Sequence, residues 1–86
     1  MDIEKCEALL TVLELGNLSA AASALGYTPS GISRMMQSLE EDAGFPLLTR
    51  SRNGVAPTSE CLQLLPAVRE MARAGRLYRE RSADSW

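Results

Sequence analysis

Histidine is absent from the 86 residues, and cysteine occurs only at Cys6 and Cys61. The two cysteines are far apart in the sequence and stand in no CxxC pattern, so the usual ligands of a zinc site are missing. No nucleophile has a base beside it, and a chain this short leaves little room to enclose a pocket. We therefore expect no metal, no cofactor and no enzymatic activity, and we expect both thiols to be small buried side chains in a reducing cytosol.

Long apolar runs are also missing. The purely apolar stretches are only a few residues long, so no segment is expected to span a membrane. The first residues lack the basic region and apolar stretch of a secretory signal. With 45% hydrophobic and 23% charged residues, the composition is typical of a soluble globular chain rather than a disordered one. We expect a cytoplasmic location. A length of 86 residues allows one small core and not two.

Acidic residues are absent from two long stretches, although the net charge is −2. Residues 15–39 contain one charge, Arg34, and residues 43–59 contain only Arg50 and Arg52. The acids are concentrated near the amino terminus and in Glu40–Asp42. Because a nucleic-acid face needs local positive potential rather than a basic chain as a whole, this distribution permits DNA binding.

Three helices are predicted in the first half of the chain. The first has an apolar stripe at three- and four-residue steps and ends at Gly16–Asn17. A short second helix covers about residues 19–25 and ends at Gly26. A third begins after an N-cap at Thr28, with Pro29 in its first turn, and continues to about residue 43.

The second and third helices form a predicted helix-turn-helix motif. Gly26 supplies the tight turn between them, and the small Ala21 and Ala22 lie where the two helices must approach closely. Ile32 and Met35 return the third helix to the core. Each feature is weak alone, but together at this spacing they indicate the motif strongly.

A β-hairpin and a long helix are predicted to follow. Two short extended segments on either side of Asn53–Gly54 predict the hairpin, a wing over residues 47–57. Thr58 caps a last helix over residues 58–81, and residues 82–86 are expected to form a flexible tail. The predicted fold is therefore mostly α: a winged helix-turn-helix over residues 1–57 followed by a linker helix.

The third helix is expected to read DNA. At about 100° per residue its apolar and polar residues fall on opposite sides. The polar side consists of Ser30, Ser33, Arg34 and Gln37, and we call it the reading face. It contains no acid, and in a major groove an arginine pairs with guanine and a glutamine with adenine. The alternative is an ordinary solvated face, although such faces usually carry Glu and Lys.

The wing carries Arg50 and Arg52 on either side of Ser51. Arginines in such a position can reach phosphates or a narrow minor groove. The alternative is that they pair with Glu40 or Glu41 on the protein surface. Arg50 is the more structural of the two, because it lies closer to the body of its strand.

The last helix shows a heptad row that predicts a homodimer. The row comprises Cys61, Leu64, Val68, Met71, Gly75 and Tyr78. A second row, comprising Leu62, Leu65 and Ala72, widens it. Because a small domain does not need both rows for its own core, we expect one to meet a second copy through Leu64, Val68, Met71 and Tyr78. The alternative is that the helix packs on its own domain only.

Pro66 is expected to bend or restart this helix. The arginines near the end of the helix are expected to be solubilising.

The sequence resembles the LysR-type transcriptional regulators over nearly its whole length. The residues that carry the resemblance are Gly16–Ala22, Leu25, Thr28–Arg34, Leu39–Glu40, Gly44, Leu47–Arg50, Thr58 and Leu64–Leu65. The resemblance implies a domain that binds double-stranded DNA and a linker helix that dimerises, with antiparallel linker helices. It further implies a tetramer in the full-length protein and a separate carboxy-terminal domain that binds a small-molecule effector.

Thr28, Pro29, Ser30, Ser33, Arg34, Gln37, Arg50 and Arg52 are the candidate DNA-binding residues. Pro29 departs from the family pattern, which often has Gln there, and offers no side-chain donor for base recognition. Gly31, Leu48 and Glu60–Cys61 also depart from it, and these changes are expected to alter only packing. The alternative function is a winged helix used for protein–protein contacts, which an acidic or apolar reading face would favour.

Overall fold

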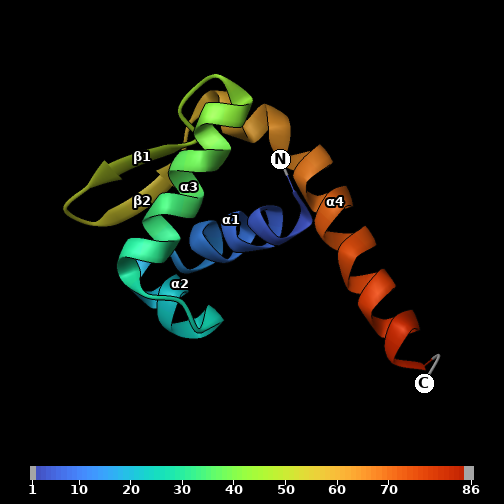
Figure 1. Ribbon diagram of the computed structural model, residues 1–86. Helices are drawn as coiled ribbons and strands as arrows, with labels where there is room; N and C mark the ends of the chain where they lie inside the picture. Colours follow the sequence, from blue (N-terminus) through green and yellow to red (C-terminus); the bar gives the residue numbers. More distant parts are fainter. Residues whose placement is uncertain (1, 85–86) are drawn as a thin grey trace.

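The computed structural model describes residues 2–84 as a small helical core with a projecting hairpin and a long final helix (Figure 1). The elements in chain order are α1 (Ile3–Leu15), α2 (Leu18–Leu25), α3 (Pro29–Ala43), β1 (Leu48–Ser51), β2 (Gly54–Pro57) and α4 (Ser59–Asp84). The predicted fold, a mostly α winged helix-turn-helix, is confirmed.

Side-chain caps begin the first three helices. Asn17 accepts a hydrogen bond from the Ala20 N–H at 2.9 Å, and the Thr28 hydroxyl accepts one from the Gly31 N–H at 3.0 Å. Each cap satisfies a backbone donor that the first helical turn leaves without a partner. The three helices end at glycines in the left-handed conformation, Gly16, Gly26 and Gly44. The predicted boundaries are therefore confirmed, apart from a start of α2 at Leu18.

The core forms around α1, which packs against α2, α3 and α4. The largest fully buried side chains of the core are Leu9, Ile32, Met36, Leu39, Leu47, Val12, Val68, Cys6 and Cys61. Ala21 and Ala22 are also buried, which confirms the close approach predicted at that point. One face of α3 is thus fixed on α1 and α2, and its opposite face is left at the surface.

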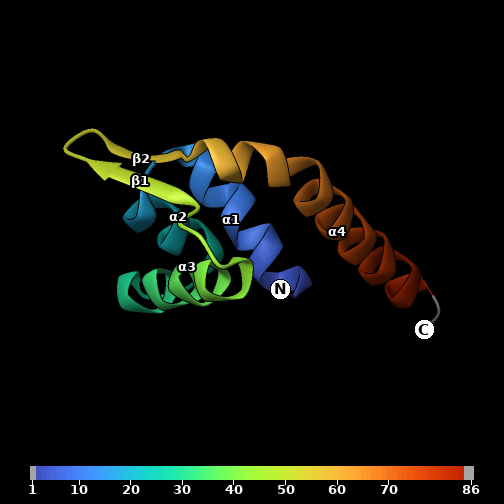
Figure 2. The same cartoon turned by 90° about the horizontal axis from the view of Figure 1, so that it is seen from above.

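The wing is a two-stranded antiparallel hairpin that projects from the helical body (Figures 1 and 2). Arg50 pairs with Val55 in the ladder, and Ser51 pairs with Gly54. Arg52 and Asn53 therefore form the turn at the tip, and Arg50 lies in a strand.

The last helix is continuous from Ser59 to Asp84, with Pro66 inside it. It changes direction between the part that follows β2 and the part that leads to the carboxy terminus (Figure 2). A proline removes one helical hydrogen bond and its ring displaces the preceding turn, so a bend without a restart is the expected result. The helix passes the predicted end at residue 81, so the prediction of a tail is wrong for residues 82–84; residues 85 and 86 lie outside the described residues.

The heptad row of α4 packs inside the molecule from Cys61 to Gly75, and only its last member, Tyr78, is exposed. Val68 is 0% exposed and belongs to the core, so the prediction that its side chain meets a second copy is wrong. Gly75 lies so close to α1 that an added Cβ would stand 2.1 Å from Ile3 Cγ2. Leu64 and Met71 are partly buried against the same core. The periodicity locates an apolar stripe on a helix but does not say which surface covers it.

Candidate nucleic-acid interface

The reading face of α3 is open to solvent. Ser30, Arg34 and Gln37 are exposed, and Ser33 is half-buried. The neighbouring apolar residues Ile32, Met36 and Leu39 are buried. The structure therefore brings together the four residues that the helical periodicity assigned to one side.

The first turn of α3 presents Thr28 and Pro29 at the same surface, and both are exposed. The Thr28 hydroxyl caps the helix and lies 3.3 Å from the Ser30 hydroxyl. A Cβ at residue 31 would stand 3.0 Å from Thr28 Oγ1, so Gly31 leaves this capping hydroxyl undisturbed. Thr28 thus fixes the start of the helix that carries the reading face.

The arginines of this surface have no acidic partner among residues 2–84. The salt bridges there join Lys5 to Asp2, Arg73 to Glu70 and Arg79 to Glu7. Arg34, Arg50 and Arg52 take part in none of them. The alternative in which the wing arginines pair with Glu40 or Glu41 is therefore wrong, and their charges are available to an external anion.

Glu40 contacts the backbone at the base of the wing instead. Its Oε2 accepts hydrogen bonds from the Leu47 N–H at 2.7 Å and from the Leu48 N–H at 3.2 Å. Nearer the tip, the Val55 N–H donates to the Gly16 carbonyl at 3.0 Å. Neither contact could be predicted from the residue pattern, because each uses a backbone donor that any residue other than proline would supply.

Contacts on α1 connect the motif to its neighbours. Lys5 Nζ donates to Ser38 Oγ on α3 at 2.7 Å. The Tyr27 hydroxyl, in the turn before α3, donates to Glu4 at 2.5 Å, and this hydrogen bond raises the pKa of Tyr27. The position of α3 is thus fixed by polar contacts with α1 as well as by the core.

Arg79 ties the outer part of α4 to α1. Its guanidinium donates to both carboxylate oxygens of Glu7. That hydrogen bonding lowers the pKa of Glu7 below its ordinary value of 4.5. Arg79 was expected to solubilise the helix, and the structure adds a contact that the sequence did not suggest, since the residue pairs with an acid 72 positions away.

Both cysteines are free and buried. Burial raises the pKa of each thiol, and Cys6 Sγ lies 3.8 Å from Met71 Sδ. Within residues 2–84, no group of three or more His, Cys, Asp or Glu side chains is placed to hold a metal ion. Nor does any helix in that range have the length and apolar character to cross a membrane.

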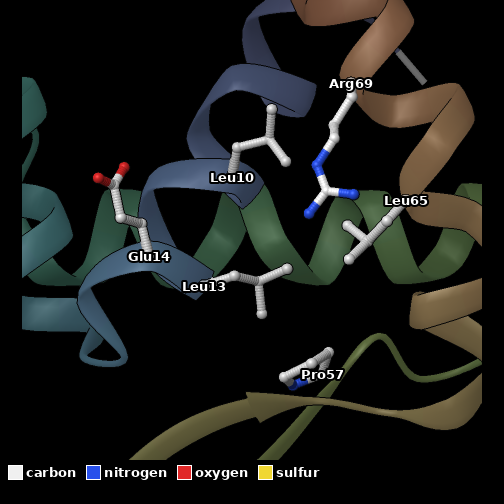
Figure 3. Close-up of a pocket in the computed structure, with 6 residues that line it drawn as sticks. All are labelled: Leu10, Leu13, Glu14, Pro57, Leu65 and Arg69. Carbon is white, nitrogen blue, oxygen red and sulfur yellow. The ribbon is translucent and has the colours of Figure 1, made fainter.

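An open groove of about 380 Å³ lies away from the reading face, between α1, α4 and the end of β2. Leu10 and Leu13 of α1 face Leu65 of α4 across it, and the Arg69 guanidinium points toward the space between Leu10 and Leu65 (Figure 3). Glu14 and Arg69 are its charged residues.

The capped helix-turn-helix and the hairpin beside it define the class: this is a winged helix-turn-helix DNA-binding domain. Residues 3–62 match the family described as "Bacterial regulatory helix-turn-helix protein, lysR family". The chain therefore belongs to the LysR family, whose members are transcriptional regulators.

Individual relatives agree with this assignment. The chain is 43% identical to the HTH-type transcriptional regulator CbbR of Rhizobium meliloti over 58 residues, 67% of this chain and 18% of that protein. It is 34% identical to the HTH-type transcriptional regulator LysG of Mycobacterium tuberculosis over 84 residues, 98% of this chain and 26% of that protein. The chain thus spans about a quarter or less of the length of these relatives.

A solved structure matches the whole domain. The crystal structure of a complex of the CbnR DNA-binding domain with DNA has a TM-score of 0.84 and 32% sequence identity, and the match covers 99% of this chain and 98% of that one. The hairpin and the long final helix are therefore part of a known domain architecture.

Proposed function

We propose that this chain reads double-stranded DNA sequence-specifically as the DNA-binding part of a bacterial transcriptional regulator. The observation that carries the proposal is the acid-free reading face, together with Arg34 and two wing arginines that form no ion pair with any acid in residues 2–84. In a winged helix, such a face suits the major groove, and the wing suits the backbone or the minor groove. The DNA complex of the CbnR domain, which has the same fold, supports the proposal.

The proposed roles follow from the chemistry of each side chain. Arg34 pairs with guanine and Gln37 with adenine, while Ser30 and Ser33 make shorter-range contacts to bases or phosphates. Thr28 and Pro29 bring the first turn of α3 against the DNA backbone. Arg52 at the wing tip contacts a phosphate or the minor groove, and Arg50 supports it from the strand.

We further propose that the regulator acts as a homodimer, with α4 contributing to the interface. Val68 is unavailable because it lies in the core, and Leu64 and Met71 are partly covered. The large apolar residues that the described part of α4 leaves exposed are Leu62, Leu77 and Tyr78. A two-fold pair of reading faces would then recognise half-sites about one helical turn, or a multiple of it, apart.

The dimer is tested by sedimentation equilibrium of the chain beside a Leu62→Glu, Leu77→Glu double variant. Charges at these two exposed positions are expected to abolish association while the fold is retained, because neither position lies in the core. Association equal to that of the wild-type chain would exclude an interface that contains either position. In the full-length regulator, we propose that a small-molecule effector binds outside this chain.

The DNA-binding proposal is tested by selecting bound duplexes from a random-sequence pool with the purified chain. The expected result is enrichment of one motif with two-fold related halves. Retention of no duplex above background would contradict DNA binding and favour the protein-contact alternative. Retention without a motif would contradict sequence-specific reading.

A further inference from the structure

The wing is attached to the rest of the domain at both of its ends, and one of the attachments uses an acid. We infer that Glu40 is a positioning residue for DNA binding: it holds the wing in a fixed orientation relative to α3, although it does not itself face DNA. This inference rests on the proposed function, because it concerns how the DNA-binding surface is assembled.

At the base, the hydrogen bonds between the wing and α3 use one carboxylate oxygen, beside the contacts that Thr58 makes with Pro46 and Leu47. Oε2 of Glu40 accepts from two successive backbone N–H groups, those of Leu47 and Leu48. Both residues are buried, at 1% and 7% exposure, so water has little access to replace the carboxylate. Hydrogen bonds to an ionised acceptor are stronger than neutral ones, and a buried donor that loses its partner is costly. Glu40 therefore fixes the point at which the wing leaves the body.

The attachment near the tip depends on the absence of a side chain. The Val55 N–H donates to the Gly16 carbonyl, and Gly54 is folded against the same peptide group. A Cβ at Gly54 would stand 2.1 Å from the Gly16 oxygen, and its φ of +120° is one that other residues rarely adopt. Gly16 immediately precedes Asn17, the N-cap of α2, so this contact joins the wing to the helix-turn-helix.

The two attachments hold opposite ends of a very short hairpin. An isolated two-stranded hairpin is marginally stable in water, so its orientation depends on what it is attached to. Arg52 lies in the turn beyond both attachments. An arginine that is already held at the correct distance from the reading face loses less conformational freedom when it binds a phosphate than one on a free loop. Glu40 is therefore expected to raise the affinity for DNA by keeping Arg52 in position for a phosphate.

The experiment is a double-variant cycle on the whole chain, measured as affinity for the motif found by the selection. Glu40→Ala, Arg52→Ala and the double variant are compared by fluorescence anisotropy over a range of salt concentrations. Removing an acid should by itself strengthen DNA binding, and Glu41→Ala controls for that charge because Glu41 is an exposed neighbour. Glu40→Gln keeps an acceptor oxygen and is expected to restore part of the affinity.

We expect Glu40→Ala to weaken binding about tenfold, as Arg52→Ala does, and to lower the salt slope by about one unit. The affinity of the double variant for the motif is expected to be no lower than that of whichever single variant binds less tightly. Gly54→Ala displaces the tip without changing the charge. When Arg52→Ala is added to a chain that already carries Gly54→Ala, it should therefore weaken binding only slightly further. All affinities are measured at a temperature where circular dichroism shows each variant folded.

Additive effects of Glu40→Ala and Arg52→Ala, or a salt slope unchanged by Glu40→Ala, would overturn the inference. A gain in affinity for Glu40→Ala equal to that for Glu41→Ala would also overturn it. Each of these results leaves the proposed function intact, because the wild-type chain would still bind its motif. A wild-type chain that binds no DNA would instead contradict the proposed function.

Discussion

The exposed side of α3 and the outer part of α4 both carry arginines, but only on α4 are arginines paired with acids. Arg79 binds Glu7, and Arg73 lies 3.9 Å from Glu70. Arg34 on α3 has no such partner within residues 2–84. A cation without an acidic partner can neutralise a phosphate without first giving up an ion pair. The pairing of charges, rather than the net charge of −2, therefore distinguishes the proposed DNA surface from the rest of the molecule.

The largest effect is expected on the inner side of α4, which serves the core. Val68→Asp would bury a charge without a partner and is expected to lower the free energy of unfolding by about 4 kcal/mol, enough to unfold a marginal domain. Gln63→Asp, at an exposed position of the same helix, should change it by less than about 0.5 kcal/mol. Urea unfolding followed by circular dichroism measures both. Equal stability of the two variants would mean that Val68 is not part of the core.

The next effect concerns the reading face. Arg34→Ala is expected to weaken binding to the selected motif by about 1–3 kcal/mol and to flatten the preference at one or two base pairs. Thermal stability should be unchanged, because the side chain is exposed. Arg76→Ala on α4 makes the same change of charge and should leave the preference intact. Equal losses for the two variants would show that only overall charge matters.

A smaller and less selective effect is expected at the wing tip. Arg52→Ala should weaken binding to most sequences alike and reduce the dependence of log K on log salt by about one unit, because one phosphate contact is lost. Affinities at several salt concentrations, for the motif and for an unrelated duplex, give both quantities. A loss confined to the motif would instead assign Arg52 to base recognition.

The smallest effect is expected from the ion pair between α1 and α4. The pKa of Glu7 in the folded state is lowered below 4.5, so its contribution to stability is present above that value and disappears as the pH falls through the lowered pKa. Glu7→Gln should therefore slightly lower the melting temperature at pH 7, and the difference should vanish near pH 2. A difference that persists at low pH would mean that the carboxylate charge is not responsible.

The helix-turn-helix could be predicted almost completely from the sequence, because its determinants are local. Thr28 caps α3, Gly26 forms the turn, and the periodicity of α3 separates Ile32 from Arg34. Each signal lies within a few residues of the structure that it determines. The reading face followed directly, because a helix with one buried face exposes the other.

The contacts between distant segments could not be predicted in the same way. The heptad row of α4 was correctly located, but most of it packs on the core of its own domain, as the burial of Val68 shows. The Glu40 carboxylate reaches backbone groups seven and eight residues away, and backbone donors leave no mark on the sequence. A charged residue in the sequence thus does not reveal whether its partner will be a phosphate, a side chain or the main chain.

An amide NMR titration of the chain with a duplex that carries one half-site locates the DNA-binding surface most directly, because it reports on each residue separately. We expect the largest changes on residues 28–37 and 50–53, which hold the reading face and the wing tip. The outer turns of α4, where Arg79 is already paired, should change little. Largest changes on α4 or on the acidic start of α1, with residues 28–37 unaffected, would contradict this expectation.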